Sequence, residues 1–233
     1  MKKEFQKSVL YSSVNDPFTM EPSSMALVIV DMQYATACRT TGMGKTAKEA
    51  GQADALEYRL SRIENVAVPN IQKLLDFFRK NKLRIIYITN GSEMPDYSDC
   101  LPHRRRMYEL RNNTKGNREH EILDEIKPLP RECVINKTTS SAFNSTNIDM
   151  ILSKAMGIKY LLFTGVSTGA CVANTARDAV DRGYQCVIVE DGCASSEEIF
   201  HSATLMHFRE RLGRVETTKD IIKELLRTLC SPS

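Results

Sequence analysis

The feature that most constrains the fold is the continuous apolar run at 26–30, which has no polar alternation. A strand with one face in water alternates apolar and polar side chains, whereas a strand that is covered on both faces does not. Comparable short runs follow at 83–89, 133–135, 160–164 and 186–189, with a weaker one near 214–216. Short buried strands separated by longer helical segments are typical of βαβ units with a parallel sheet.

Helical periodicity fills the gaps between these runs. The segment 65–81 repeats apolar side chains at helical spacing, at Val66, Ile71, Leu74, Leu75 and Phe78. Further helices are predicted at 147–156, 171–182, 197–211 and 218–229. The sequence therefore predicts an α/β fold, a three-layer α/β/α sandwich with a six-stranded, mostly parallel sheet. With the strands numbered along the chain, the predicted order is 3-2-1-4-5-6, within a single domain over 1–233.

Composition excludes several classes of protein. The chain is 42% hydrophobic and 26% charged with a net charge of +3, which is typical of a soluble protein and argues against nucleic-acid or membrane partners. Its apolar runs are far too short to span a membrane. Seven cysteines without a C-x-x-C pair indicate neither a zinc site nor a disulfide framework. With no export signal, this odd count indicates a reducing compartment, and we expect a cytoplasmic protein.

Three reactive side chains follow predicted strands. Asp31 ends the first strand, Lys137 follows the third and Cys171 opens the helix after the fourth. Ligands of open parallel sheets bind at the carboxyl ends of the strands, so we expect these side chains to share one site. Each residue alone has an ordinary reading as a turn, surface or packing residue. In the predicted strand order Lys137 must reach over from a more distant strand.

The chemistry of these residue types suits nucleophilic catalysis. The turn 165–169 consists of small residues, and the helix that follows offers free N–H groups and a positive dipole end. We expect this helix end and the ammonium of Lys137 to lower the pKa of the Cys171 thiol. Asp31 would then accept the thiol proton and later deliver it to a leaving amine.

Three segments make the sequence similar to a known family. The first strand with its continuation (26–33), the segment around Lys137 (136–143) and the segment around Cys171 (165–172) resemble those of isochorismatase-like cysteine hydrolases. The resemblance continues at 174–179, 183–184 and 190–194, in order, and covers about residues 25 to 217.

This resemblance implies a mechanism and an assembly. Cys171 would attack a carbonyl carbon, Asp31 would take its proton, and Lys137 would balance the charge. The backbone N–H groups of Ser167 and Cys171 would form the oxyanion hole, beside a cis peptide bond between Val166 and Ser167. Water would then hydrolyse a thioester. Members of the family also lead us to expect a homodimer or homotetramer.

Departures from the family narrow the activity. Nicotinamidases carry an Asp/His metal cluster between the catalytic Asp and Lys, and here that interval holds only His103 and His120 among its histidines, without the motif. We therefore predict no metal. The presence of Cys171 favours cleavage of a small amide, ureido or carbamoyl compound, as in N-carbamoylsarcosine, ureidoacrylate, biuret, maleamate or streptothricin hydrolases. Two alternatives stay open: vinyl-ether hydrolysis of the isochorismate type, and a non-catalytic member that binds a metabolite or a partner.

Nucleotide-binding patterns are incomplete. The segment 42–46 resembles the end of a phosphate loop, but Arg39 occupies the place of its first glycine. No G-x-G-x-x-G follows the first strand. We therefore predict no cofactor.

The residues that contact the substrate are less clearly marked. Gln33 and Tyr34 follow Asp31 and would either face the substrate or pack the loop. Phe143 would be a pocket wall or a core residue. In the run 103–106 an arginine could meet a substrate carboxylate, or the run could be a solvated loop. The long segments 32–62 and 91–119 are candidates for covering the substrate or for subunit contacts.

Overall fold

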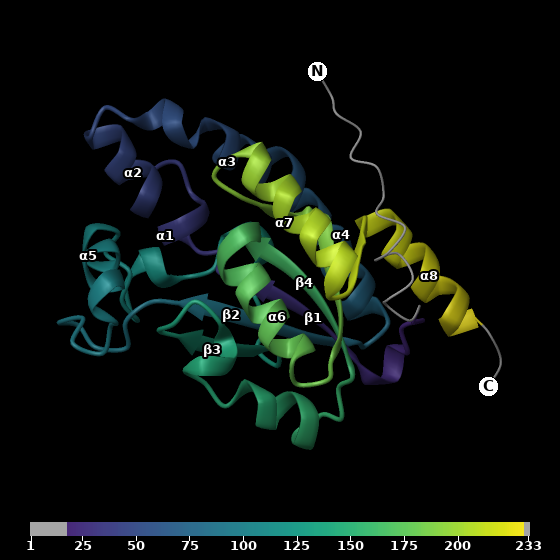
Figure 1. The fold of residues 1–233 in the computed structure, drawn as a ribbon. Coiled ribbons are helices and arrows are strands. Elements are labelled where there is room, and N and C mark those ends of the chain that lie inside the picture. The colour runs from purple at the N-terminus through teal and green to yellow at the C-terminus, as the bar shows by residue number, and fades with distance from the viewer. Residues whose placement is uncertain (1–17, 231–233) are drawn as a thin grey trace.

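The computed structural model describes residues 18–230, and its centre is one parallel sheet (Figure 1). The sheet has six strands in the order β3-β2-β1-β4-β5-β6, and all five neighbouring pairs are parallel. The strands are β1 (Met25–Val30), β2 (Arg84–Asn90), β3 (Cys133–Lys137), β4 (Tyr160–Val166), β5 (Gln185–Ala194) and β6 (Arg214–Glu216). The predicted fold class and strand order are confirmed.

Helices cover both faces of this sheet. One apolar cluster joins the sheet to α4 (Val68–Lys80) and α8 (Thr218–Cys230), and a second joins it to α6 (Ala173–Val180) and α7 (Glu198–Arg211). Side chains of β1 alternate between the clusters, with Leu27 in the first and Val28 in the second. Two-sided burial therefore explains why this strand is apolar throughout.

The remaining helices lie in the connections at the carboxyl ends of the strands. The segment after β1 contains α1 (Tyr34–Ala37), α2 (Gly42–Glu49) and α3 (Glu57–Arg62), and the segment after β2 contains α5 (Pro102–Leu110). In Figure 1, α1, α2 and α5 lie together beyond one end of the sheet. Within residues 18–230, no helix is both long enough and apolar enough to cross a membrane.

Several boundaries differ from those predicted. The helix predicted at 65–81 begins earlier, because α3 continues through a π-helical turn at Ile63–Ala67 into α4. The segment predicted as a helix at 147–156 is mainly a π-helical turn at Met150–Ala155. β3 extends as far as Lys137, so this lysine ends the strand and does not follow it. Helix ends and π turns depend on local hydrogen bonding that periodicity does not report.

Candidate active site

The carboxylate of Asp31 lies just beyond the end of β1. Its backbone turns out of the strand with φ 54°, a left-handed conformation that Asp adopts more readily than most residues. The N–H of Asp31 donates to the carbonyl of Ile88 at 2.8 Å, and its own carbonyl accepts from the Thr36 hydroxyl. Only 2% of Asp31 is exposed. The turn therefore fixes a buried carboxylate at the carboxyl end of the sheet.

Lys137 reaches this carboxylate from β3. Its Nζ donates to Asp31 Oδ2 at 2.9 Å and to the carbonyl of Thr139 at 3.2 Å, and its side chain is 0% exposed. β2 lies between β1 and β3, so the lysine crosses a whole strand, as the predicted strand order requires. The other oxygen, Asp31 Oδ1, is buried without a hydrogen-bond partner within the described chain. The pair therefore leaves one carboxylate oxygen free to accept a proton.

Cys171 stands beside this pair. It belongs to a π-helical turn at Thr168–Val172 that leads directly into α6, and only 5% of it is exposed. Its sulfur interacts electrostatically with Asp31 and Lys137. The structure thus brings together the three residues that the sequence singled out.

The thiol of Cys171 does not titrate as we predicted. Burial raises its pKa, and the negative charge of Asp31 raises it further. Lys137 and Arg104 act in the opposite direction but are outweighed. The prediction of a lowered thiol pKa was therefore wrong, because loss of solvation dominates. A thiol that stays protonated needs a base when it attacks, and the carboxylate of Asp31, which interacts with the thiol and has one unpaired oxygen, can serve as that base.

The turn before Cys171 is sterically tight. Gly165 has φ +107°, and a Cβ on it would lie 2.0 Å from the carbonyl oxygen of Val30 on β1. Glycine is therefore required for β4 to approach β1 this closely. One residue further, the peptide bond between Val166 and Ser167 is cis, as the resemblance implied. The oxyanion hole of Ser167 and Cys171 N–H groups stays a prediction.

Buried and half-buried arginines surround the same site. Arg59, 3% exposed, donates to the carbonyl of Thr36 and to the hydroxyl of Ser167. Burial, with the positive charge of Arg111, lowers the pKa of Arg59 to about 10, so it remains charged at neutral pH. Arg104 Nη2 lies 3.9 Å from the sulfur of Cys171. Arg104 belongs to the run for which carboxylate binding was considered.

Polar residues of α6 and of the loop after β3 complete the surroundings of the sulfur. Ser140 Oγ lies 3.9 Å from Cys171 Sγ and accepts from the side-chain amide of Asn174 at 2.8 Å. Both residues fall inside the segments that carried the family resemblance, whereas Arg59 and Arg111 lie in the two long segments. The only earlier signal for these arginines was that long connections tend to be functional.

Two of the predicted substrate-binding residues have structural partners instead. The amide of Gln33 is fully buried, donates to the carbonyl of His120 at 2.7 Å and accepts from the N–H of Asn90 at 2.8 Å. Phe143 belongs to the core cluster and packs on Tyr184, with ring centroids 6.0 Å apart. These contacts favour the packing alternative for both residues.

Tyr34 is also engaged elsewhere. The guanidinium of Arg118 lies 3.9 Å from its ring centroid, and its hydroxyl accepts from the N–H of Asp124 at 3.3 Å. Tyr34 lines a surface cavity with residues of α4. This position favours a role in packing the connection after β1.

In the part of the chain that the structure describes, no three His, Cys, Asp or Glu side chains are grouped so that they could hold a metal ion.

Comparison with known proteins identifies the family. A model of the isochorismatase domain matches residues 25–220 of this chain. The chain belongs to the isochorismatase family. This isochorismatase-family protein is 30% identical to the ureidoacrylate amidohydrolase RutB of Rhizobium rhizogenes over 233 aligned residues, which cover 94% of this chain and 90% of the relative. It is 31% identical to RutB of Agrobacterium fabrum, with 88% and 91% of the two chains covered.

Solved structures agree with this assignment. The cysteine hydrolase of Pseudomonas syringae pv. phaseolicola is 22% identical with a TM-score of 0.75, over 91% of this chain and 97% of that one. The N-carbamoylsarcosine amidase of Thermoplasma acidophilum is 26% identical with a TM-score of 0.61, over 84% and 96%. The isochorismatase-family protein thus shares its fold with hydrolases.

Proposed function

We propose that this protein is an amidohydrolase that cleaves a C–N bond of a small amide, ureido or carbamoyl compound, with Cys171 as nucleophile. The observation that carries the proposal is the buried thiol beside an Asp31–Lys137 pair in which Asp31 Oδ1 has no hydrogen-bond partner within the described residues. The names of the similar amidohydrolases support the same bond type.

The first half of the reaction forms a thioester. Cys171 Sγ attacks the carbonyl carbon while its proton moves to the free oxygen of Asp31. Backbone N–H groups at Ser167 and Cys171 would stabilise the oxyanion, and one such donor typically contributes about 2.7–4 kcal/mol to lowering the barrier. The C–N bond then breaks, and the leaving nitrogen takes the proton from Asp31. Lys137 keeps the carboxylate oriented through its bond to Oδ2.

The second half regenerates the enzyme. Asp31 takes a proton from a water molecule as that water attacks the thioester carbonyl carbon. The C–S bond breaks, the acid or carbamate leaves, and the sulfur recovers a proton from Asp31. Asp31 is the only acid or base in this reaction scheme. Each proton that it accepts is later donated to the leaving nitrogen or to the sulfur.

Two alternatives predict different behaviour. A vinyl-ether hydrolase of the isochorismate type would survive loss of Cys171. A non-catalytic binding member would have no need of an acceptor oxygen beside the thiol, so the free oxygen of Asp31 favours catalysis. The homodimer or homotetramer expected from the family stays a prediction, which light scattering of the purified protein tests.

The test is ammonia release from a panel of small amides, ureido acids and carbamoyl compounds that includes ureidoacrylate. Wild type, Cys171→Ala and Cys38→Ser are compared. Cys38 is a suitable control because hydrogen bonds from Thr40 and Thr41 outweigh its burial and lower its pKa, which makes it the more acidic thiol. We expect turnover by wild type and Cys38→Ser, and loss of at least about 10³-fold in Cys171→Ala.

The outcomes separate the alternatives. Equal ammonia release by wild type and Cys171→Ala would refute the cysteine mechanism. Loss of turnover in Cys38→Ser would indicate that Cys38, and not Cys171, is the nucleophile. No ammonia release from any compound, with folded protein, would refute the amidohydrolase and leave the vinyl-ether and binding alternatives.

A further inference from the structure

The surroundings of Cys171 carry an excess of positive charge. Asp31 and Lys137 neutralise each other in their ion pair. Arg59, Arg104 and Arg111 all interact electrostatically with the sulfur, and none of them forms an ion pair with a carboxylate within residues 18–230. Charged groups removed from water are ordinarily paired with an opposite charge. The site therefore lacks an anion.

Arg104 presents an unused donor at the reacting sulfur. Its Nη1 is buried without a hydrogen-bond partner within the described chain, while Nη2 lies 3.9 Å from Cys171 Sγ. The guanidinium also lies 5.8 Å from the ring centroid of Tyr108, whose hydroxyl donates to the buried side chain of Asn90. Tyr108 therefore holds the guanidinium in place beside the thiol. The two terminal nitrogens of such a fork match the two oxygens of a carboxylate.

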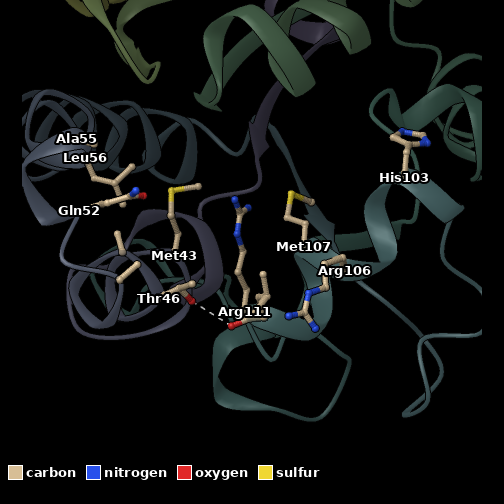
Figure 2. A pocket seen from close by; sticks show the side chains of 12 residues that line it. Met43, Thr46, Gln52, Ala55, Leu56, His103, Arg106, Met107 and Arg111 are labelled. Atoms are coloured by element: carbon tan, nitrogen blue, oxygen red, sulfur yellow. Dashed lines mark hydrogen bonds between the residues drawn. The ribbon is translucent and has the colours of Figure 1, made fainter.

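Arg111 connects the same place to a cavity. It is the residue that follows α5, three positions after Tyr108, and it lines a cavity of about 500 Å³ between α2 and α5. Figure 2 shows its side chain extended between Met43 and Met107, with the guanidinium aimed away from its own backbone into this space. The positive charge of Arg104 lowers the pKa of Arg111, after the effect of burial, so the two guanidinium groups influence each other. Arg111 thus belongs both to the cavity wall and to the group of charges that interact with Cys171.

We propose that Arg104 and Arg111 bind a carboxylate of the substrate next to Cys171. This inference rests on the proposed function and narrows it, because the substrate class becomes amides or ureido compounds that also carry a carboxylate. Arg104 is the specificity-determining residue of the pair, since its free Nη1 lies in the same guanidinium as the nitrogen nearest to the sulfur. Arg59 is excluded from this role because its guanidinium already donates to Thr36 and Ser167.

The test compares two alkylating reagents of nearly the same shape. Iodoacetate carries a carboxylate where the neutral iodoacetamide carries an amide. In both reagents a thiolate displaces iodide from the CH₂ carbon, which leaves a carboxymethyl or a carbamoylmethyl group on the sulfur. Initial rates at Cys171 are measured by peptide mass spectrometry at one pH and low salt. Glutathione, measured in parallel, corrects for the intrinsic difference between the reagents. The readout is the corrected ratio of the iodoacetate rate to the iodoacetamide rate.

In wild type this ratio is about 10 or more, because hydrogen bonds to charged groups favour the anion by that order. Arg104→Met brings the ratio close to that of glutathione. Arg104→Lys gives an intermediate ratio, because the positive charge remains but the two parallel N–H donors of the guanidinium are lost. Arg111→Met lowers the ratio in part. The matched control is Arg105→Met. Arg105 is the next residue of α5, is half-exposed and pairs with Glu109, so its loss leaves the ratio unchanged. Near-UV circular dichroism and thermal melting establish that each variant is folded.

Two results would overturn the proposal. One is a wild-type ratio no higher than that of glutathione. The other is a folded Arg104→Met variant in which the iodoacetate and iodoacetamide rates fall by the same factor, so that their ratio equals that of wild type. This result would mean that Arg104 only stabilises the thiolate. The ratio requires no turnover, so failure of the amidohydrolase assay and failure of the carboxylate site are separate results.

Discussion

Lys137→Met is expected to destabilise the protein strongly. The ammonium of Lys137 is fully buried and makes two hydrogen bonds, to Asp31 Oδ2 and to the carbonyl of Thr139. Methionine fills similar space without a charge. The variant therefore leaves the carboxylate of Asp31 buried without the ammonium that bonds its Oδ2. Breaking a buried pair in this way costs about 3–5 kcal/mol, which is roughly a 10²- to 10⁴-fold change in the unfolding equilibrium.

The assay is urea unfolding followed by circular dichroism at pH 7. Lys154→Met is the matched control, because Lys154 is exposed and its loss is expected to change the free energy of unfolding by about 0.5 kcal/mol or less. The double variant Asp31→Asn with Lys137→Met removes both charges and should recover about 2 kcal/mol or more of the loss. A loss below about 1 kcal/mol in Lys137→Met, or no recovery in the double variant, would refute the account of the pair.

Three further predictions concern other parts of the site. Alkylation of Cys171 by iodoacetamide should be half-maximal at a higher pH than alkylation of Cys38. Burial raises the pKa of Cys171, whereas hydrogen bonds outweigh burial and lower the pKa of Cys38. The reverse order, measured by peptide mass spectrometry, would contradict this. Gly165→Ala should prevent folding or lower the melting temperature sharply, because its Cβ would lie 2.0 Å from a carbonyl oxygen of β1. Gly183→Ala, at φ +89° with no atom within 4 Å, should cost only about 1 kcal/mol, and equal effects would count against steric contact as the cause. Gln33→Leu should cost about 2 kcal/mol or more in urea unfolding, because it leaves two buried backbone groups unpaired, and a change in KM without loss of stability would restore its role as a substrate contact.

The framework of the site could be predicted because it follows from local patterns. Because β1 is buried on both faces, its sequence is a continuous apolar run that is recognisable without the structure. The carboxyl ends of such strands lie at one edge of a parallel sheet. Asp31, Lys137 and Cys171 each stand at such an end. The crossing of β2 by Lys137 followed from the predicted strand order.

The details that were missed depend on distant parts of the chain. Arg111, which the sequence did not single out, acts on Cys171 because it follows α5 beyond the carboxyl end of the sheet, and no periodicity in 91–119 reports that packing. The direction of the Cys171 pKa depends on how completely other segments bury the sulfur, which residue type and helix position do not reveal. The buried contacts of Gln33 could not be predicted for the same reason, since its two partners lie on β2 and in the connection after α5.

Whether Cys171 forms a covalent intermediate is tested by mass spectrometry of enzyme that is quenched with acid during turnover of ureidoacrylate or of the best substrate of the panel. We expect an acyl or carbamoyl adduct on the peptide that contains Cys171, present during turnover, absent after substrate is exhausted and absent in Cys171→Ala. Sustained ammonia release with Cys171 unmodified at every quench time, or an adduct on another residue, would contradict it.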